Sequence, residues 1–160
     1  MTATTAEATR TPGGRLPPRF VIRAFWVVHR AIHRFSGGRL GLRPASETTW
    51  GMMKLKTIGR KSGRQRTAIL GYYEDGPNLV TMAMNGWGAP EPAWWLNLQA
   101  HPETTVALHD RTIAVRGRAA TPEERPRLWE IWGRYDGPDD LDAWASRRPR
   151  ETAVVILEPR

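Results

Sequence analysis

Four cationic side chains crowd a short, glycine-punctuated segment of this 160-residue sequence, TIGRKSGRQRTAILGYY at residues 57–73. They are Arg60, Lys61, Arg64 and Arg66. Arginine forms planar, bidentate contacts with phosphates and carboxylates, and lysine adds a compact charge. Glycine-rich loops also expose backbone N–H groups that bind anions. The segment therefore predicts either an anion-binding loop ahead of a strand or a solvated, charged turn.

Residues for several other chemistries are missing from the sequence. There is no cysteine, which excludes disulfides and thiolate chemistry. No phosphate-loop or nucleophile-elbow motif occurs. His29 and His33 have the spacing of metal ligands on a helix, but no third ligand is near them in the sequence. We therefore expect neither a metal site nor a side-chain nucleophile.

The overall charge favours an anionic partner. Lysine and arginine outnumber the acidic residues by 24 to 16, and the net charge is +8. Nucleic acid, an anionic membrane surface and a polyanionic small molecule all fit this charge. A nucleic-acid binder would need aromatic side chains on its strands as a stacking platform. The expected strands carry mostly aliphatic residues, so we expect no nucleic-acid partner, although a nucleic-acid binding module stays among the alternatives.

The N-terminal part differs in composition from the rest. Residues 1–18 are rich first in Thr and Ala and then in Gly and Pro, which predicts a disordered tail. Residues 19–38 have an apolar stripe at steps of three and four opposite a row of arginines, which predicts a basic amphipathic helix. Such a helix either packs on the body of the protein or lies on an anionic membrane.

No uncharged apolar run approaches the roughly 18 residues of a membrane span, and no signal-peptide pattern is present. We expect a cytoplasmic protein and propose, from the basic segment, a peripheral location at the inner face of the cell membrane.

Alternating apolar residues and turn signals predict a small α+β barrel after this segment, as one domain at residues 39–160. Thr121 and Glu124 have capping-box spacing at the start of the expected second helix, and Pro126 should bend or delay that helix. Strands are expected at 48–58, 67–73, 78–84, 104–110, 111–120 and 152–159, and helices at 91–101, from Thr121, and in DDLDAWASR near 139–147.

Three ordered segments carry a resemblance to a known family. They are LKTIGRKSGRQRTAILGYY at 55–73, MAMNGWGAPEPAWWLNLQAHPETTVAL at 82–108 and RAATPEERPRLWEIW at 118–132. Together they resemble the deazaflavin-dependent nitroreductase family, which comprises coenzyme F420-dependent quinone and nitro-compound reductases of actinobacteria. The motif T-x-G-R-K-S-G-x-x-R and the segment P-x-W-W-x-N-L-x-A-H-P carry most of this likeness.

The resemblance implies a split β-barrel like that of FMN-binding oxidoreductases. It also implies a deazaflavin cofactor, coenzyme F420, which bears a phosphate and a polyglutamate tail. The implied reaction is hydride transfer from the reduced cofactor to a quinone or nitroaromatic acceptor. An FMN-binding oxidoreductase of the same fold and a non-catalytic cofactor carrier remain alternatives, and a homodimer is a further expectation.

The resemblance also implies the site residues. Many relatives carry Ser-Lys where this chain has Met84-Asn85, which removes one phosphate-facing cation, and tryptophans replace the tyrosines of the late helical region. Trp94, Trp95 and Asn97 are assigned to the scaffold. The expected cofactor contacts are Arg60, Lys61, Ser62, Gly63, Arg66, Thr67, Ala68, Ile69, Leu70, Met84, Asn85 and Gly86. The expected substrate pocket comprises Trp87, Trp129, Trp132 and Tyr135, and either Tyr135 or solvent donates the proton.

Overall fold

The structure is a computed structural model that describes residues 41–135 and 141–160. The chain divides into two units, 1–40 and 41–160, and all of the described residues belong to the second. The predicted disordered tail at 1–18 and the predicted helix at 19–38 therefore lie outside the described residues.

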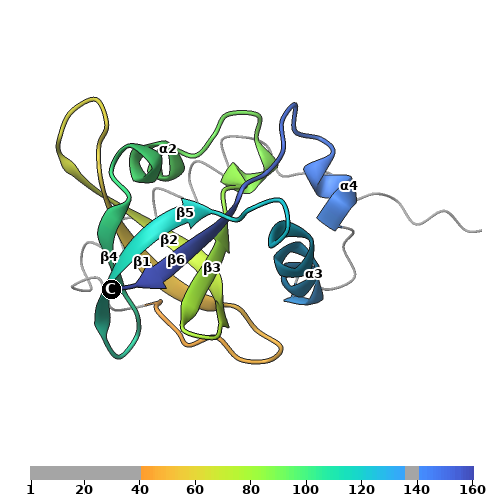
Figure 1. Cartoon of the computed structure of the whole chain (residues 1–160), viewed down its shortest axis with the longest axis horizontal. Coiled ribbons are helices and arrows are strands. Elements are labelled where there is room, and N and C mark those ends of the chain that lie inside the picture. The colour runs from red at the N-terminus through yellow and green to blue at the C-terminus, as the bar shows by residue number, and fades with distance from the viewer. Residues whose placement is uncertain (1–40, 136–140) are drawn as a thin grey trace, which may run out of the picture. The chain divides into compact units, whose positions relative to one another are not determined.

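Six antiparallel strands close into a barrel in the order β1-β2-β3-β6-β5-β4 (Figure 1). This arrangement confirms the α+β barrel expected from the alternating apolar residues. The strands are β1 (Gly51–Ile58), β2 (Gln65–Asp75), β3 (Asn78–Met82), β4 (Glu103–Ala107), β5 (Thr112–Ala119) and β6 (Val154–Pro159).

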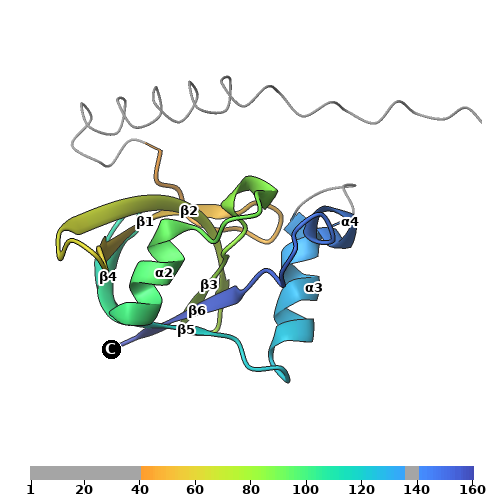
Figure 2. The same ribbon diagram turned by 90° about the horizontal axis from the view of Figure 1, so that it is seen from above.

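Short helices lie on different sides of this barrel (Figures 1 and 2). Helix α2 contacts β1, β2 and β5, whereas α3 contacts β6. None of the helices in the described ranges has the length and apolar character needed to cross a bilayer. The helical elements are the single 3-10 turn η1 (Asn85–Trp87), α2 (Ala93–Ala100), α3 (Arg125–Tyr135) and α4 (Leu141–Ala145).

The register of β1 determines which side chains face the barrel interior. It pairs with β2 along its whole length, from Gly51↔Tyr72 to Ile58↔Gln65. Alternate residues of β1 are buried, and directly opposed residues share a face. Thr57 is thus on the inner face at the end of the barrel next to the β1–β2 loop, opposite Arg66. On its other edge β1 joins β4 through only two residue pairs, Lys54↔Ala107 and Leu55↔Val106.

Two hydrophobic clusters stabilise the fold. The first fills the barrel and includes Met53, Leu55 and Val115, with Leu98 of α2 packed against them. The second joins residues of β2, β3 and β6 to α3 and α4, and its members include Tyr73 and Trp132. Because adjacent strand residues point to opposite faces, the same strands serve both clusters.

The start of α3 has the geometry that its sequence predicts. The Thr121 N–H donates to the Glu124 carboxylate at 2.8 Å, and the Glu124 N–H donates to the Thr121 hydroxyl at 3.3 Å. These reciprocal bonds form a capping box. Regular helix nevertheless begins only at Arg125, so the helix is delayed as Pro126 predicts.

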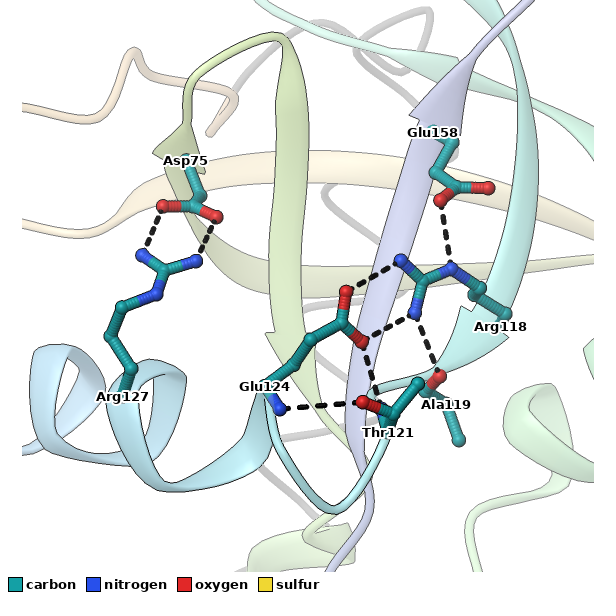
Figure 3. A network of polar contacts seen from close by, with 7 residues as sticks. All are labelled: Asp75, Arg118, Ala119, Thr121, Glu124, Arg127 and Glu158. Atoms are coloured by element: carbon teal, nitrogen blue, oxygen red, sulfur yellow. Dashed lines mark hydrogen bonds and ion pairs between the residues drawn. The ribbon is translucent and has the colours of Figure 1, made fainter.

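A polar network joins the capping box to the barrel (Figure 3). The Arg118 guanidinium of β5 donates to both Glu124 oxygens, at 2.7 and 2.9 Å, and to Glu158 of β6 at 2.8 Å. Arg127 of α3 forms a second bidentate pair with Asp75 at the end of β2. The network thus connects α3 to three strands.

Candidate functional site

A cavity of about 410 Å³ lies at the end of the barrel, between the β1–β2 loop and the N-terminal end of α2. Its volume is in the range of small-molecule sites, roughly 300–1,000 Å³. The wall combines cationic, hydroxyl, amide and apolar groups. The lining residues are Thr57, Gly59, Arg60, Lys61, Ser62, Arg66, Thr67, Ala68, Asn85, Pro92, Ala93, Trp94 and Asn97.

The β1–β2 loop is held by its own backbone. The N–H groups of Ser62 and Gly63 both donate to the Gly59 carbonyl, at 3.1 and 2.8 Å, and the Gly59 N–H donates to Arg64 O at 2.9 Å. Gly63 has a φ of +62°, which glycine adopts without strain. The N–H groups of Gly59, Ser62 and Gly63 therefore bond within the loop. The loop's charged donors at the cavity are its side chains.

Asn97 connects this loop to α2. Its side chain is buried, with 5% exposed, and its Oδ1 accepts the Arg60 N–H at 3.1 Å. Its Nδ2 donates to the Thr57 hydroxyl at 3.3 Å. One amide thus fixes the end of β1 and the first cationic residue of the loop.

The N-terminal end of α2 forms the opposite wall. No side chain caps this helix, whose N-cap is Pro92, and the first-turn residues Ala93 and Trp94 both line the cavity. The first N–H groups of a helix lack intrahelical partners and carry a partial positive charge. This wall therefore adds to the positive potential of Arg60, Lys61 and Arg66.

A left-handed turn supplies the remaining lining residue. Asn85, Gly86 and Trp87 have φ values of +48°, +58° and +61°. The Asn85 side chain donates to Pro90 O at 3.0 Å, and Asn85 lines the cavity. Trp87 and Met84, on either side of Asn85 and Gly86, pack instead against the second hydrophobic cluster.

The structure brings seven of the expected cofactor contacts together at the cavity. They are Arg60, Lys61, Ser62, Arg66, Thr67, Ala68 and Asn85. The cavity wall does not include the other five, Gly63, Ile69, Leu70, Met84 and Gly86. Ile69 faces Lys54 across the β1–β2 pair, and Leu70 packs against the barrel core.

The expected substrate-pocket residues belong to the second hydrophobic cluster. Trp132 is 2% exposed and lies 5.1 Å, centroid to centroid, from Trp50. Tyr135 stacks on Tyr73 at 5.8 Å with an interplanar angle of 16°. Burial raises the pKa of Tyr73, whose hydroxyl donates to Leu128 O at 2.9 Å. Trp129 packs on the same cluster and donates to Asp142 at 2.8 Å.

The sequence interpretation did not include Thr57, Gly59, Pro92 and Ala93 among the site residues, and it gave Trp94 and Asn97 a scaffold role. The position of Asn97 between the apolar residues Leu96 and Leu98 was the available signal, because a buried polar side chain requires partners. Within the described ranges, no group of three or more His, Asp or Glu side chains is placed to hold a metal ion.

Solved structures with a similar fold define the class. One, described as an F420-H2 dependent reductase, is 23% identical, with a TM-score of 0.59 over 74% of this chain and all of its own. Another, described as a domain-swapped dimer, is 22% identical, with a TM-score of 0.60 over 85% of this chain and 99% of its own. The fold is thus a split β-barrel, as the resemblance implied.

Sequence similarity identifies the family. The family model described as F420H(2)-dependent quinone reductase matches residues 26–159, so the chain belongs to this family. An F420H(2)-dependent quinone reductase of Mycobacterium tuberculosis H37Rv is 29% identical over 136 residues, which are 83% of this chain and 89% of that protein. The chain is accordingly an F420H2-dependent oxidoreductase whose cofactor is coenzyme F420 and whose acceptor is a small molecule of the quinone class.

Proposed function

We propose that the cavity at the end of the barrel binds coenzyme F420 through its anionic groups, and that the enzyme reduces nitroaromatic compounds as well as quinones. The observation that carries the first part is the concentration of Arg60, Lys61 and Arg66 at one cavity wall. The nitroaromatic acceptor rests on the resemblance in sequence alone.

The donor set fits the chemistry of this cofactor. Its phosphate and carboxylates need charge-assisted donors, which the three cationic side chains and the Ser62 hydroxyl provide. Its flat ring needs apolar contact, which Ala68, Pro92 and Trp94 provide.

Reduced coenzyme F420 supplies a hydride when bound, so the protein needs only to bind, orient and exclude water. The cationic loop would hold the anionic end, and the rigid attachment of that loop to α2 through Asn97 would keep it in place. Tyr135 as the proton donor stays a prediction.

Removing single cations tests the site. Lys61→Ala and Arg66→Ala should each weaken coenzyme F420 binding roughly ten- to a hundredfold, because a hydrogen bond to a charged group contributes about 1.5–3 kcal/mol. Thermal stability should barely change, since both side chains are exposed. Isothermal titration at two salt concentrations measures this, and salt should weaken binding to the wild type more steeply than to the variants.

Arg64→Ala is the matched control, because Arg64 belongs to the same loop but not to the cavity wall. It should leave affinity within about twofold, as expected for a solvated cation. If Lys61→Ala and Arg66→Ala bound coenzyme F420 as tightly as Arg64→Ala does, the cavity would not be the cofactor site. Titration with FMN alongside separates a deazaflavin site from a flavin site.

The acceptor is tested with the reduced cofactor. Oxidation of F420H2 is followed with a soluble quinone and with a nitroaromatic compound. Turnover with the quinone alone would contradict the nitroaromatic part of the proposal.

Two further proposals concern assembly and location. The basic segment 19–38 would assist binding to anionic membranes from the cytoplasm, and loss of liposome binding on deletion of residues 1–38 would support this.

The similar structure described as a domain-swapped dimer favours a homodimer, which sedimentation would detect.

A further inference from the structure

A buried arginine outside the cavity contacts the segment that forms part of the cavity wall. Arg148 follows α4 and is 6% exposed. Its Nη1 donates to Ala83 O at 2.9 Å and to the Thr152 hydroxyl at 2.7 Å, and its Nε donates to Gly88 O at 3.1 Å. The two carbonyls lie on either side of residues 84–87, so one guanidinium holds both ends of that segment.

The segment needs such support because its backbone is left-handed. The φ values of Asn85, Gly86 and Trp87 are all between +48° and +61°. Glycine adopts this region freely and asparagine with little cost, but tryptophan does so only under constraint. Unfavourable backbone of this kind persists where the surroundings hold it and is concentrated at functional sites.

The hydrogen bonds of Arg148 to the ends of the turn are shorter than its ion pair with Glu91. The nearest carboxylate, Glu91, is 3.6 Å from Nη2, beyond good hydrogen-bond distance. Within the part of the chain that the structure describes, Nη2 and Glu91 Oε2 are both buried without a hydrogen-bond partner. The well-formed bonds of Arg148 thus go to the backbone at the two ends of the turn and to Thr152.

We propose that Arg148 is a positioning residue for cofactor binding. It holds the left-handed turn 85–87 in the conformation that sets Asn85 at the cavity wall and Trp87 in the second hydrophobic cluster. The inference rests on the proposed function of the cavity.

Arg148→Lys removes the paired hydrogen bonds to Ala83 O and Gly88 O while keeping the positive charge beside Glu91. A lysine has one nitrogen on a flexible stem and cannot reproduce the planar fork that reaches Ala83 O and Gly88 O together. The Trp87 and Gly88 N–H groups donate to Met84 O and Asn85 O within the turn. In the cofactor-free variant these amides should exchange about tenfold faster or more, and the dissociation constant for coenzyme F420 should rise about tenfold.

Arg125→Lys is the matched control. Arg125 also donates to the backbone of the C-terminal segment, at Thr152 O, pairs with Glu151 and lies over the Trp129 ring. Among the residues that the structure describes, none of these partners belongs to the turn 85–87. Both amides and the cofactor affinity should stay within about twofold of wild type, because only general stability is affected.

Gly86→Ala tests the turn without removing any contact. A Cβ at Gly86 would meet nothing within 4 Å, so the substitution changes only the preference for a left-handed backbone. Affinity for coenzyme F420 should fall roughly fivefold or more. Gly76→Ala, at a residue with φ +60° and equal free space in the β2–β3 turn, should leave the affinity unchanged.

If the Trp87 and Gly88 amides exchanged at the wild-type rate in Arg148→Lys, Arg148 would not hold the turn 85–87. Faster exchange with unchanged affinity, or unchanged affinity in Gly86→Ala, would overturn its role in cofactor binding. Equal effects in Arg125→Lys and Arg148→Lys would reduce both arginines to general stabilisers and overturn the proposal. The exchange measurement needs no cofactor, so a wild type that fails to bind coenzyme F420 would contradict the proposed function and leave this test intact.

Discussion

At the scale of single residues, Asn97 has the most specific role in the cavity. It is the buried amide whose two ends meet Arg60 N and the Thr57 hydroxyl. A buried donor or acceptor left unpaired costs about 1–3 kcal/mol. Asn97 therefore contributes both to the stability of the loop and to its alignment with α2.

Two substitutions at Asn97 should separate these contributions. Asn97→Leu leaves the Arg60 N–H and the Thr57 hydroxyl without partners and should lower the free energy of unfolding by about 1–3 kcal/mol. Asn97→Asp keeps an acceptor for both groups, since the Thr57 hydroxyl can donate, but places a negative charge among the cavity cations. It should preserve stability and weaken coenzyme F420 binding roughly tenfold.

Urea unfolding and cofactor titration measure the two effects. Gln99→Leu, at an exposed position of the same helix, is the control and should change neither quantity appreciably. Equal affinity of Asn97→Asp and wild type would show that the anionic cofactor does not bind near this amide.

At the scale of elements, the position of α2 depends on a glycine in the barrel wall. A Cβ at Gly117 of β5 would lie 2.4 Å from Leu98 Cδ2 and 2.7 Å from Leu98 Cγ. Leu98 is fully buried in the first cluster. The missing side chain at Gly117 thus allows α2 to approach the barrel and form the cavity wall.

Gly117→Ala should displace α2. Overpacking of a filled core costs about 1–3 kcal/mol, and the shift should move Asn97 and Trp94 relative to the cationic loop. We expect a lower thermal midpoint together with weaker coenzyme F420 binding. Gly133→Ala in α3 is the control, because its Cβ would meet only Leu141 Cδ2 at 3.7 Å and helix interiors favour alanine. An affinity unchanged in Gly117→Ala would contradict the role of α2.

The sequence was sufficient for the elements and for part of the site. Alternating apolar residues made the strands recognisable, and capping residues made the start of α3 recognisable, because both patterns are local. The cationic loop was recognisable by its residue types. The contact between Asn97 and Arg60 spans 37 positions and depends on how α2 packs, which no local pattern encodes. The burial of Trp132 in the second cluster likewise depends on how α3 packs on the barrel, and its expected substrate role stays a prediction.

At the scale of the whole molecule, Figure 3 shows how ion pairs connect α3 to the barrel. Hydrogen bonds from Arg118 hold the pKa of Glu124 down to about 2, from an ordinary value of 4.5. A pKa lowered by folding means that the carboxylate stabilises the fold above pH 4.5 and loses this effect as the pH falls towards 2. Hydrogen bonds from Arg127 lower the pKa of Asp75 in the same direction.

Glu124→Gln should therefore cost stability in a pH-dependent way. The difference in free energy of unfolding from wild type should be about 1 kcal/mol at pH 7, since the pair is partly exposed and screened, and should shrink towards zero near pH 2. Urea unfolding at several pH values measures it. Glu130→Gln, which removes an exposed ion pair with Arg134 on the same helix, should show almost no difference at any pH. A gap for Glu124→Gln that stays constant with pH would contradict the assignment.

The two edges of β1 are paired to very different extents. The strand joins β4 through two residue pairs, with a further bond from the Thr104 hydroxyl to Lys56 O, against eight pairs with β2. The cationic loop directly follows β1, and α2 directly precedes β4. Coenzyme F420 bound between the two walls, as proposed, would therefore link β1 to β4 at the least extensively paired strand junction of the closed barrel, and binding would stabilise that junction by mass action.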